Sequence, residues 1–324
     1  MNKCRICDAE NDHKTYFARE MMFGLRDEFE YFECSNCGCL QILIFPTDMT
    51  KYYPVKYYSL KKINRVEHWA KGQRLSYYID GKNLFGYLLT RLYSPQKRVS
   101  ELIIKNTAEW ITLAKIKYYY KILDVGCGNG ALLFQMRAAG FSNLTGIDPY
   151  LDADYISKNG VKLLKRELTE IEEQFDFVML HHTFEHLSDP LKALAEVYRV
   201  CKPRSIVLIR IPVASGYAWR KYGNHWVQLD APRHYFLHTR KSIEILANKV
   251  SFKISDVIYD STEFQFWGSE QYIRDIPLRD AKSYGVNPKL SIFSEDDIRS
   301  FRSRAEELNK NQDGDSACFL LHKK

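Results

Sequence analysis

Residues 121–130, which read Lys-Ile-Leu-Asp-Val-Gly-Cys-Gly-Asn-Gly, decide the fold. An apolar run typical of a buried strand leads directly into three alternating glycines, and a helix-forming run, Ala131–Ala139, follows at once. Glycine has no Cβ, so such a loop can turn tightly and let a nucleoside-bearing cofactor approach the backbone. Asp148 ends the next apolar segment, roughly 20 residues after the glycines, where nucleoside-binding βαβ units place a ribose-binding carboxylate.

The charge beside the glycines separates two classes of cofactor. Dinucleotide-binding loops read Gly-x-Gly-x-x-Gly, whereas the spacing here is Gly-x-Gly-x-Gly. Asp124 stands two residues before the first glycine, where its carboxylate would repel a pyrophosphate held at a helix N-terminus. S-adenosylmethionine carries a sulfonium and an ammonium group and no phosphate, so the acidic loop favours this cofactor.

Three segments resemble motifs of the class I S-adenosylmethionine-dependent methyltransferases, namely Leu123–Gly130, Gly146–Pro149 and Phe175–Pro190. The resemblance implies that the glycines pass under the methionine part and the ribose, and that Asp148 accepts hydrogen bonds from the ribose hydroxyls. It places Glu167 near the adenine amino group, where the family more often has Asp. The cofactor-binding residues expected on this basis are Asp124, Gly126, Cys127, Gly128, Asn129, Gly130, Asp148, Pro149, Glu167 and His181.

Two Cys-x-x-Cys pairs lie near the N-terminus: Cys4 with Cys7, and Cys34 with Cys37. Four thiolates at this spacing can close a tetrahedral shell around Zn²⁺, and a shell of four leaves no open position for catalysis. We therefore expect a structural zinc ion. Disulfides or free thiols are the alternative, and disulfides are disfavoured in a chain that reads as cytosolic.

The order of apolar runs predicts an α/β fold. Strands are expected at residues 121–125, 144–147, 161–164, 175–180 and 206–211, with helices at 131–139, 190–201 and 241–250 between or after them. Such alternation implies a Rossmann-like, doubly wound parallel sheet. Residues 252–259 and 317–322 supply two final strands, which the resemblance places in an antiparallel hairpin and which bring the sheet to seven strands.

The composition divides the chain into three parts. Residues 1–50 read as a zinc-ribbon-like domain with strands at 29–34 and 40–45. Residues 51–118 form a helical segment, with helical spacing over 67–92 and 101–117. Residues 119–324 form the methyltransferase domain, with an insertion at about 263–315 that contains a helix over 295–309.

Two loops that follow strands of the sheet carry unusual chemistry, residues 181–186 and 217–235. Ligands of open α/β sheets bind at the carboxyl ends of the strands, and a neutral imidazole is the usual acceptor of a hydroxyl proton near pH 7. We expect His182, His186 or His234 to act as the base, with Asp230 orienting His234. Two other interpretations stay open: His182 and His186 could bind a metal, or His186 could only cap the following helix.

The second loop also resembles methyltransferases encoded beside glycan-synthesis genes, including sugar C-methyltransferases with an N-terminal zinc domain. Arg220 and Arg233 would bind a phosphate or carboxylate, and Trp226 would offer a flat face to a sugar, although a structural role of the aromatic residues is equally open. The expected acceptor is a small molecule, a sugar or nucleotide sugar, methylated on oxygen or carbon. An RNA or protein methyltransferase and a non-catalytic binding protein are the alternatives.

Net charge and hydropathy limit the kinds of partner and the cellular location that we expect. The net charge of +7 over 324 residues permits an anionic substrate, while Lys and Arg are spread evenly, which makes a nucleic-acid partner unlikely. Because the sequence has no apolar run near 18 residues and no apolar core at the N-terminus for secretion, we expect a cytoplasmic protein without a membrane span. The oligomeric state stays unknown.

Overall fold

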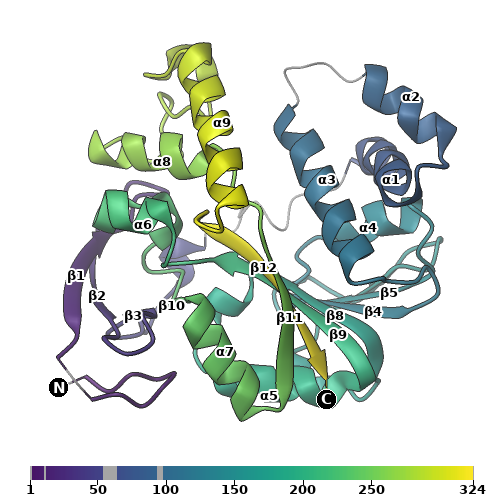
Figure 1. Ribbon diagram of the computed structural model, residues 1–324, viewed down its shortest axis with the longest axis horizontal. Helices are drawn as coiled ribbons and strands as arrows, with labels where there is room; N and C mark the ends of the chain where they lie inside the picture. The colour runs from purple at the N-terminus through teal and green to yellow at the C-terminus, as the bar shows by residue number, and fades with distance from the viewer. Residues whose placement is uncertain (1, 11, 54–63, 93–97, 324) are drawn as a thin grey trace.

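The computed structural model describes residues 2–10, 12–53, 64–92 and 98–323. Its central sheet has the strand order β11-β12-β9-β8-β4-β5-β7-β6 (Figure 1). The strands are β4 (Lys121–Val125), β5 (Asn143–Ile147), β6 (Tyr155–Ile156), β7 (Lys162–Leu164), β8 (Phe175–His181), β9 (Cys201–Pro212), β11 (Phe252–Tyr259) and β12 (Ser316–Lys323). The five strands from β9 to β7 pair in parallel, and β11 and β12 are antiparallel. The predicted Rossmann-like sheet with its final antiparallel pair is therefore confirmed.

Among the described residues, the sheet has eight strands rather than the expected seven. The extra strand is β6, a two-residue segment that pairs antiparallel with β7 at the edge of the sheet. Both of its residues are exposed, so no apolar run marks it in the sequence.

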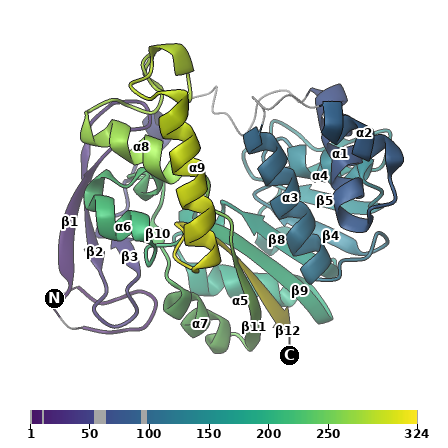
Figure 2. The same cartoon turned by 45° about the horizontal axis from the view of Figure 1, so that its top comes forward.

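Helices cover both faces of this sheet, as a doubly wound fold requires. Alternate residues of β8 point to opposite sides: Val178 and Leu180 join the core beneath α5 (Pro190–Val200) and α7 (Arg240–Lys249). Phe177 and Met179 join the core beneath α3 (Arg98–Leu113) and α4 (Ala131–Ala138). Figure 2 shows the two helical layers on either side of the strands.

The helical segment that precedes the sheet lies across α4. It consists of α1 (Arg65–Asp80), α2 (Leu84–Leu92) and α3. Gly81, with a φ of 71°, ends α1 and so divides the range 67–92, over which the sequence shows helical spacing, into two helices. Gly72 of α1 faces Ala138 of α4 so closely that a Cβ on the glycine would lie 2.4 Å from the Ala138 Cβ. The missing side chain lets the two helices meet directly.

A second, smaller sheet has the order β1-β2-β3-β10 and is antiparallel throughout. Its first three strands are β1 (Lys14–Arg19), β2 (Glu28–Glu33) and β3 (Leu40–Ile42), whereas β10 (Phe236–Leu237) comes from the later part of the chain. We had expected the N-terminal region to be separate. Instead, residues that follow the 217–235 loop complete its sheet.

The insertion packs against the loop after β9. It contains α8 (Phe264–Ile273), which the sequence did not predict, and α9 (Glu295–Lys310), which it did. Both helices lie on the side of the molecule that holds the small sheet, beside α6 (Tyr217–Tyr222) (Figure 1). No helix among the described residues is long and apolar enough to cross a membrane.

Candidate active site

The glycine-rich loop runs from the end of β4 to the start of α4. Gly126, Gly128 and Gly130 have φ values of 72°, 52° and 76°, a region that favours glycine. A Cβ on Gly126 would lie 2.4 Å from the hydroxyl oxygen of Thr183, and one on Gly130 would lie 2.6 Å from the Leu163 side chain. The backbone of this loop therefore packs directly against Thr183 and Leu163, with no room for a side chain at Gly126 or Gly130. Through Thr183, Gly126 contacts the loop that follows β8.

Two carboxylates converge behind these glycines. Asp148 accepts hydrogen bonds from the Gly128 amide at 3.0 Å and from the Tyr150 amide at 2.9 Å. Asp124 is buried, and its burial together with the neighbouring Asp148 raises the pKa of Asp124 to about 8. A buried carboxyl group whose pKa is raised by burial and by a neighbouring carboxylate is stabilised in its charged form by a cationic ligand. The site thus fits the positively charged methionine part of S-adenosylmethionine.

The other expected cofactor residues lie around this loop with different local roles. The Asn129 side chain accepts the Ala131 amide at 3.1 Å and so begins α4, and burial raises the pKa of Cys127. Pro149 is exposed after β5, and Glu167 is exposed and caps the short helix Leu168–Glu170. The His181 ring lies 5.5 Å from the Trp110 ring, and its buried Nε2 has no hydrogen-bond partner among the described residues.

His182 is held on both its backbone and its side chain by Arg210 of β9. Its φ of 50° is uncommon outside glycine, and its amide donates to the Arg210 carbonyl at 2.9 Å. The guanidinium of Arg210, which is itself paired with the buried Asp260, contacts His182 Nε2. Guanidinium groups only donate, so Nε2 must accept and the proton of His182 sits on Nδ1. That Nδ1 lies 3.3 Å from Oε1 of Glu185.

His186 and His234 both carry their proton on the nitrogen that faces the backbone. Nδ1 of His186 lies 2.8 Å from the Arg233 carbonyl oxygen, and Nδ1 of His234 lies 2.7 Å from the Gln228 carbonyl oxygen. A carbonyl can only accept, so in each ring Nδ1 is the donor and Nε2 keeps its lone pair. The rings lie 4.8 Å apart between their centres, which brings two proton acceptors together.

Glu185 lies against these two rings and is completely buried. Its Oε1 is 4.0 Å from Nε2 of His234, and neither of its carboxylate oxygens has a hydrogen-bond partner of good geometry among the described residues. Burial alone would raise the pKa of Glu185, but the nearby Nδ1–H of His182 and the other imidazoles lower it to about 2. Burial and the neighbouring His234 lower the pKa of His186, so that ring is neutral at pH 7. The site offers lone pairs and a negative charge to a proton or another cation.

Comparison of the sequence with known protein families identifies the family of this chain. A family model described as a methyltransferase domain matches residues 89–257, just over half of the chain. The chain belongs to this methyltransferase family. The glycine loop, the two carboxylates behind it and the doubly wound sheet agree with this match and are those of a class I S-adenosylmethionine-dependent methyltransferase domain.

Several relatives are named as methyltransferases too. The chain is 33% identical over 122 residues to a ubiquinone biosynthesis O-methyltransferase of Pseudomonas putida, which is 34% of this chain and 50% of that protein. The methyltransferase spans about half the length of the curated relatives it matches first. Among solved structures, a methyltransferase from Archaeoglobus fulgidus is 19% identical with a TM-score of 0.42, and covers 69% of this chain and 94% of its own.

A second solved structure is magnesium protoporphyrin IX methyltransferase from Synechocystis with bound S-adenosylhomocysteine. It is 13% identical with a TM-score of 0.42, and the alignment covers 70% of this chain and 87% of that protein.

The structure corrects two of the residues expected to bind the substrate. Trp226 is completely buried in the core beside Trp219, and its indole nitrogen donates to Asp315 at 2.9 Å. Arg233 is also completely buried, between Asp230 and Glu20. Neither side chain can meet a substrate in this conformation, because both serve packing and charge pairing within the protein.

Arg220 lies elsewhere, on exposed surface, where it pairs with Asp313 of the insertion at 2.6 Å. Asp230 does lie beside His234, with Oδ2 3.9 Å from Nε2, but its hydrogen bonds go to the Arg233 guanidinium. The orienting acceptor of His234 is the Gln228 carbonyl instead. Because this acceptor is a backbone carbonyl, which every residue has, no side-chain pattern in the sequence could have identified it.

The four predicted cysteines come together at the start of the small sheet. The sulfurs of Cys4 and Cys37 are 3.7 Å apart, those of Cys7 and Cys34 are 3.5 Å apart, and all four lie within 4.8 Å of one another. A disulfide needs about 2.05 Å between sulfurs, whereas four tetrahedral Zn–S bonds of about 2.3 Å place them roughly 3.8 Å apart. The spacing fits a zinc ion, and the thiols are unpaired.

The surroundings of Cys4 also favour metal binding, because hydrogen-bond donors point at its sulfur. The amide of Ile6 donates to the Cys4 sulfur at 3.4 Å, and the Gln41 side chain donates to it at 3.0 Å. The hydrogen bond from Cys37 is the main reason that the pKa of Cys4 is lowered to about 4. Donors aimed at sulfur stabilise a thiolate, which is the form that binds metal.

Proposed function

We propose that this methyltransferase transfers a methyl group to a hydroxyl of a small molecule, and that His234 and His186 supply the base. The observation that carries the proposal is the pair of Nε2 lone pairs beside the buried carboxylate of Glu185. The loop that bears Glu185 touches Gly126 of the cofactor loop through Thr183, so the base lies next to the expected cofactor site.

The cofactor would be held by the residues around the glycine loop. Asp148 would accept from the ribose hydroxyls, and the backbone of Gly126–Gly130 would lie against the methionine part, while Asp124 and Asp148 offset its positive charge. When bound, S-adenosylmethionine supplies a methyl group on a positively charged sulfur. The protein then has to orient the acceptor and remove its proton.

The proton would move to Nε2 of His234. The ring that forms is an imidazolium, and its positive charge lies 4.0 Å from Glu185 and 3.9 Å from Asp230. The Nδ1–H bond to the Gln228 carbonyl holds the ring in place throughout. His186 stays neutral because burial lowers its pKa, so it can accept a proton in turn or bind a second hydroxyl of the acceptor.

For the acceptor we favour a sugar or nucleotide sugar, on the resemblance of residues 217–235 to methyltransferases of glycan synthesis. The relatives named as ubiquinone biosynthesis O-methyltransferases support transfer to oxygen on a small molecule. The four-cysteine cluster would hold a structural zinc ion. An RNA or protein acceptor remains the rival.

The test uses methyl-labelled S-adenosylmethionine with a fractionated extract of the source cell. Label in the small anionic fraction supports the proposal, and label in RNA or protein refutes it. His234→Gln should then lower labelling of the same fraction about 100-fold while affinity for S-adenosylhomocysteine stays within threefold. Unchanged labelling would show that the base lies elsewhere.

One observation favours a second mechanism at the same site. Ligand atoms of Glu185, His186 and His234 all lie within 4.8 Å of one another, a grouping that could hold a divalent cation. His182, which we had paired with His186 as a possible metal ligand, is not in this group, and its Nε2 contacts the Arg210 guanidinium. Removal of metal by a chelator separates the mechanisms: a base needs no metal, so labelling that survives chelation excludes the cation.

A further inference from the structure

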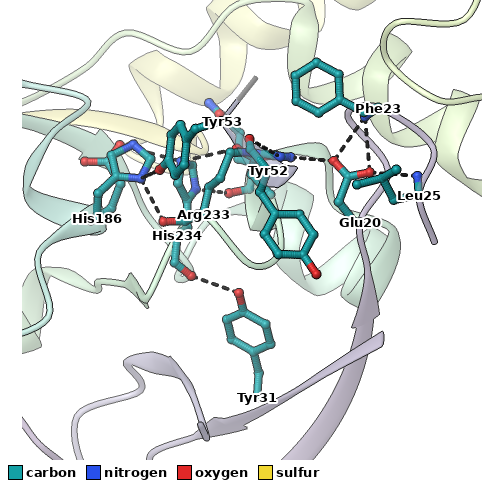
Figure 3. A network of polar contacts seen from close by, with 12 residues as sticks. Glu20, Phe23, Leu25, Tyr31, Tyr52, Tyr53, His186, Arg233 and His234 are labelled. Carbon is teal, nitrogen blue, oxygen red and sulfur yellow. Dashed lines mark hydrogen bonds and ion pairs between the residues drawn. The ribbon is translucent and has the colours of Figure 1, made fainter. Parts of the chain in front are cut away.

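The loop that carries His234 is anchored by the N-terminal part of the chain through Arg233. The Arg233 side chain is completely buried, and all three of its guanidinium nitrogens are bonded. Nε and Nη2 donate to the two oxygens of Asp230 at 2.9 and 2.6 Å, Nη2 also donates to Glu20 at 2.9 Å, and Nη1 donates to the Tyr52 carbonyl at 3.2 Å. One side chain therefore joins three segments (Figure 3).

Glu20, the distant partner, is equally buried and is itself fixed. It follows β1, and its carboxylate accepts hydrogen bonds from the amides of Phe23 and Leu25, each at 3.0 Å. Figure 3 shows the carboxylate between these amides and the guanidinium. With donors on both of its oxygens, the buried carboxylate is held in place, so it sets the position of Arg233 rather than following it.

The backbone of Arg233 contacts His186 of the candidate active site, while its side chain is bonded to Glu20 and Tyr52 of the N-terminal part. The Arg233 carbonyl is the acceptor that fixes the proton of His186 on Nδ1. The next carbonyl, of His234, accepts from the buried Tyr31 hydroxyl at 2.9 Å. Two successive peptide groups thus link β2 of the small sheet to both histidines (Figure 3).

The connection continues from there to the cysteine cluster. The Tyr235 carbonyl accepts from the Ile42 amide at 3.0 Å, and Phe236 pairs with Gln41 in the small sheet. Gln41 donates to the Cys4 sulfur, and the Thr239 hydroxyl donates to the Cys37 carbonyl at 2.6 Å. The histidine loop and the cysteine cluster therefore share one hydrogen-bonded framework.

We propose that Glu20 is a positioning residue of the acceptor site, acting through Arg233 to hold His186 with its Nε2 lone pair directed into the site. The inference rests on the proposed function for its assignment of His186 and His234 as proton acceptors. It makes the N-terminal domain a component of the acceptor site, not a separate module that recruits a partner. Residues far apart in the sequence, from the first 53 and from 230–239, then form one functional unit.

The test is the tautomer of His186 in full-length protein labelled with ¹⁵N-histidine, with signals assigned from His186→Gln and His234→Gln. In the wild type both rings should show protonated Nδ1 and unprotonated Nε2. Glu20→Gln keeps the size of the side chain but removes the charge that holds Arg233 and replaces one of the two acceptor oxygens with an NH2 group. We expect His186 to shift toward the Nε2-protonated form, while affinity for S-adenosylhomocysteine stays within threefold of the wild type.

Two further variants keep the test decisive. Arg233→Lys retains the positive charge beside Glu20 but cannot reach all three partners, so the same shift of His186 is expected if Glu20→Gln does not fold. Glu101→Gln is the matched control: it removes the partner of Arg74, which is 1% exposed and lies in the helical segment. The control should leave both histidine tautomers unchanged.

Folded Glu20→Gln or Arg233→Lys protein with wild-type histidine tautomers overturns the inference. A tautomer shift that is also seen in Glu101→Gln, or that comes with loss of S-adenosylhomocysteine binding, overturns it as well, because the effect would then be general. The proposed function fails separately: if His186→Gln and His234→Gln both label the acceptor fraction normally, the histidines are not bases, although Glu20 can still control their tautomer.

Discussion

The contact between Gly126 and Thr183 gives a prediction whose size follows from the structure. Gly126→Ala adds a methyl group 2.4 Å from the Thr183 hydroxyl oxygen and 2.6 Å from its methyl carbon. Real Cβ atoms do not come within 3.0 Å of other heavy atoms, so Thr183 or the cofactor loop must move. The left-handed backbone at φ 72° adds about 1–2 kcal/mol for any residue with a Cβ.

Gly160→Ala separates these two contributions. Gly160 also has a left-handed φ, 91°, but a Cβ there would meet nothing within 4 Å. It should therefore lose only the backbone contribution, about 1 kcal/mol of unfolding free energy, and bind S-adenosylhomocysteine like the wild type. Gly126→Ala should lose about 1–3 kcal/mol more than Gly160→Ala, as overpacked sites do, and should bind S-adenosylhomocysteine at least tenfold more weakly.

The assays are urea denaturation for stability and titration calorimetry with S-adenosylhomocysteine for binding. A double variant, Gly126→Ala with Thr183→Ala, removes the two closest atoms and should restore part of both losses, since contacting residues are not additive. Equal stabilities and equal affinities of Gly126→Ala and Gly160→Ala would refute the reasoning, because the close approach of the two loops would then have no consequence.

Three other perturbations have definite expected outcomes. Asp148→Ala should weaken S-adenosylhomocysteine binding about 100-fold while thermal unfolding still shows a folded protein; wild-type affinity in calorimetry would exclude the ribose contact. Burial lowers the pKa of His181 and of His238 to about 3, so the unfolded chain takes up those protons first and each ring lowers the free energy of unfolding as pH drops from about 6.5 toward 3. The raised pKa of Asp124, about 8, acts in the opposite direction, so the contribution of His238 is measured as the wild type minus His238→Gln; a difference that stays flat in urea titrations between pH 7.5 and 5 would contradict this. Cys34→Ser should leave less than one zinc per chain by elemental analysis and lower the melting temperature, whereas wild-type protein that carries no zinc would contradict the assignment of the cysteine cluster.

The sequence predicted the central sheet well because burial dominates there. Residues 121–125 form β4 with the predicted bounds because all but Lys121 are buried, and residues 252–259 form β11 with the predicted bounds although only Phe252 among them is buried. The strand β1 was not predicted, because it lies at the edge of the small sheet and only Ala18 of its six residues is buried. Edge strands with exposed side chains leave no apolar alternation to read.

Charged residues were harder to interpret because their partners lie far away in the sequence. Arg233 was expected to bind a substrate anion, yet its anion is Glu20, 213 positions earlier. One local signal existed: Glu20 stands directly before Met21, Met22 and Phe23, where an acidic side chain beside apolar neighbours suggests burial and a hidden partner. Which arginine it meets is decided by the pairing of β3 with β10, and no spacing in the chain reveals that pairing.

The three histidines of the site are not interchangeable, although the sequence treats them as equal candidates. Arg210 occupies Nε2 of His182, so this ring presents an N–H toward Glu185 and has no lone pair for a substrate proton. His186 and His234 have their Nδ1–H on carbonyls and present lone pairs. The hydrogen-bond partners of each ring, not its distance from the cofactor loop, therefore decide which histidines can accept a proton.

This difference between the three rings leads to a last prediction, which rests on the tautomers assigned from their hydrogen-bond partners. His182→Asn keeps an N–H donor near the Nδ1 position but has no titratable proton, whereas His182→Ala removes the donor. If His182 orients Glu185, Asn should lower labelling of the acceptor fraction less than tenfold and Ala about 100-fold, with the pH dependence of the Asn variant unchanged. If His182 is the base, both variants must lose activity equally, because neither side chain can accept a proton. Glu185 would then need another donor to keep its buried charge, and none of the described residues other than His182 lies within 3.5 Å of its Oε1 as an ion-pair partner.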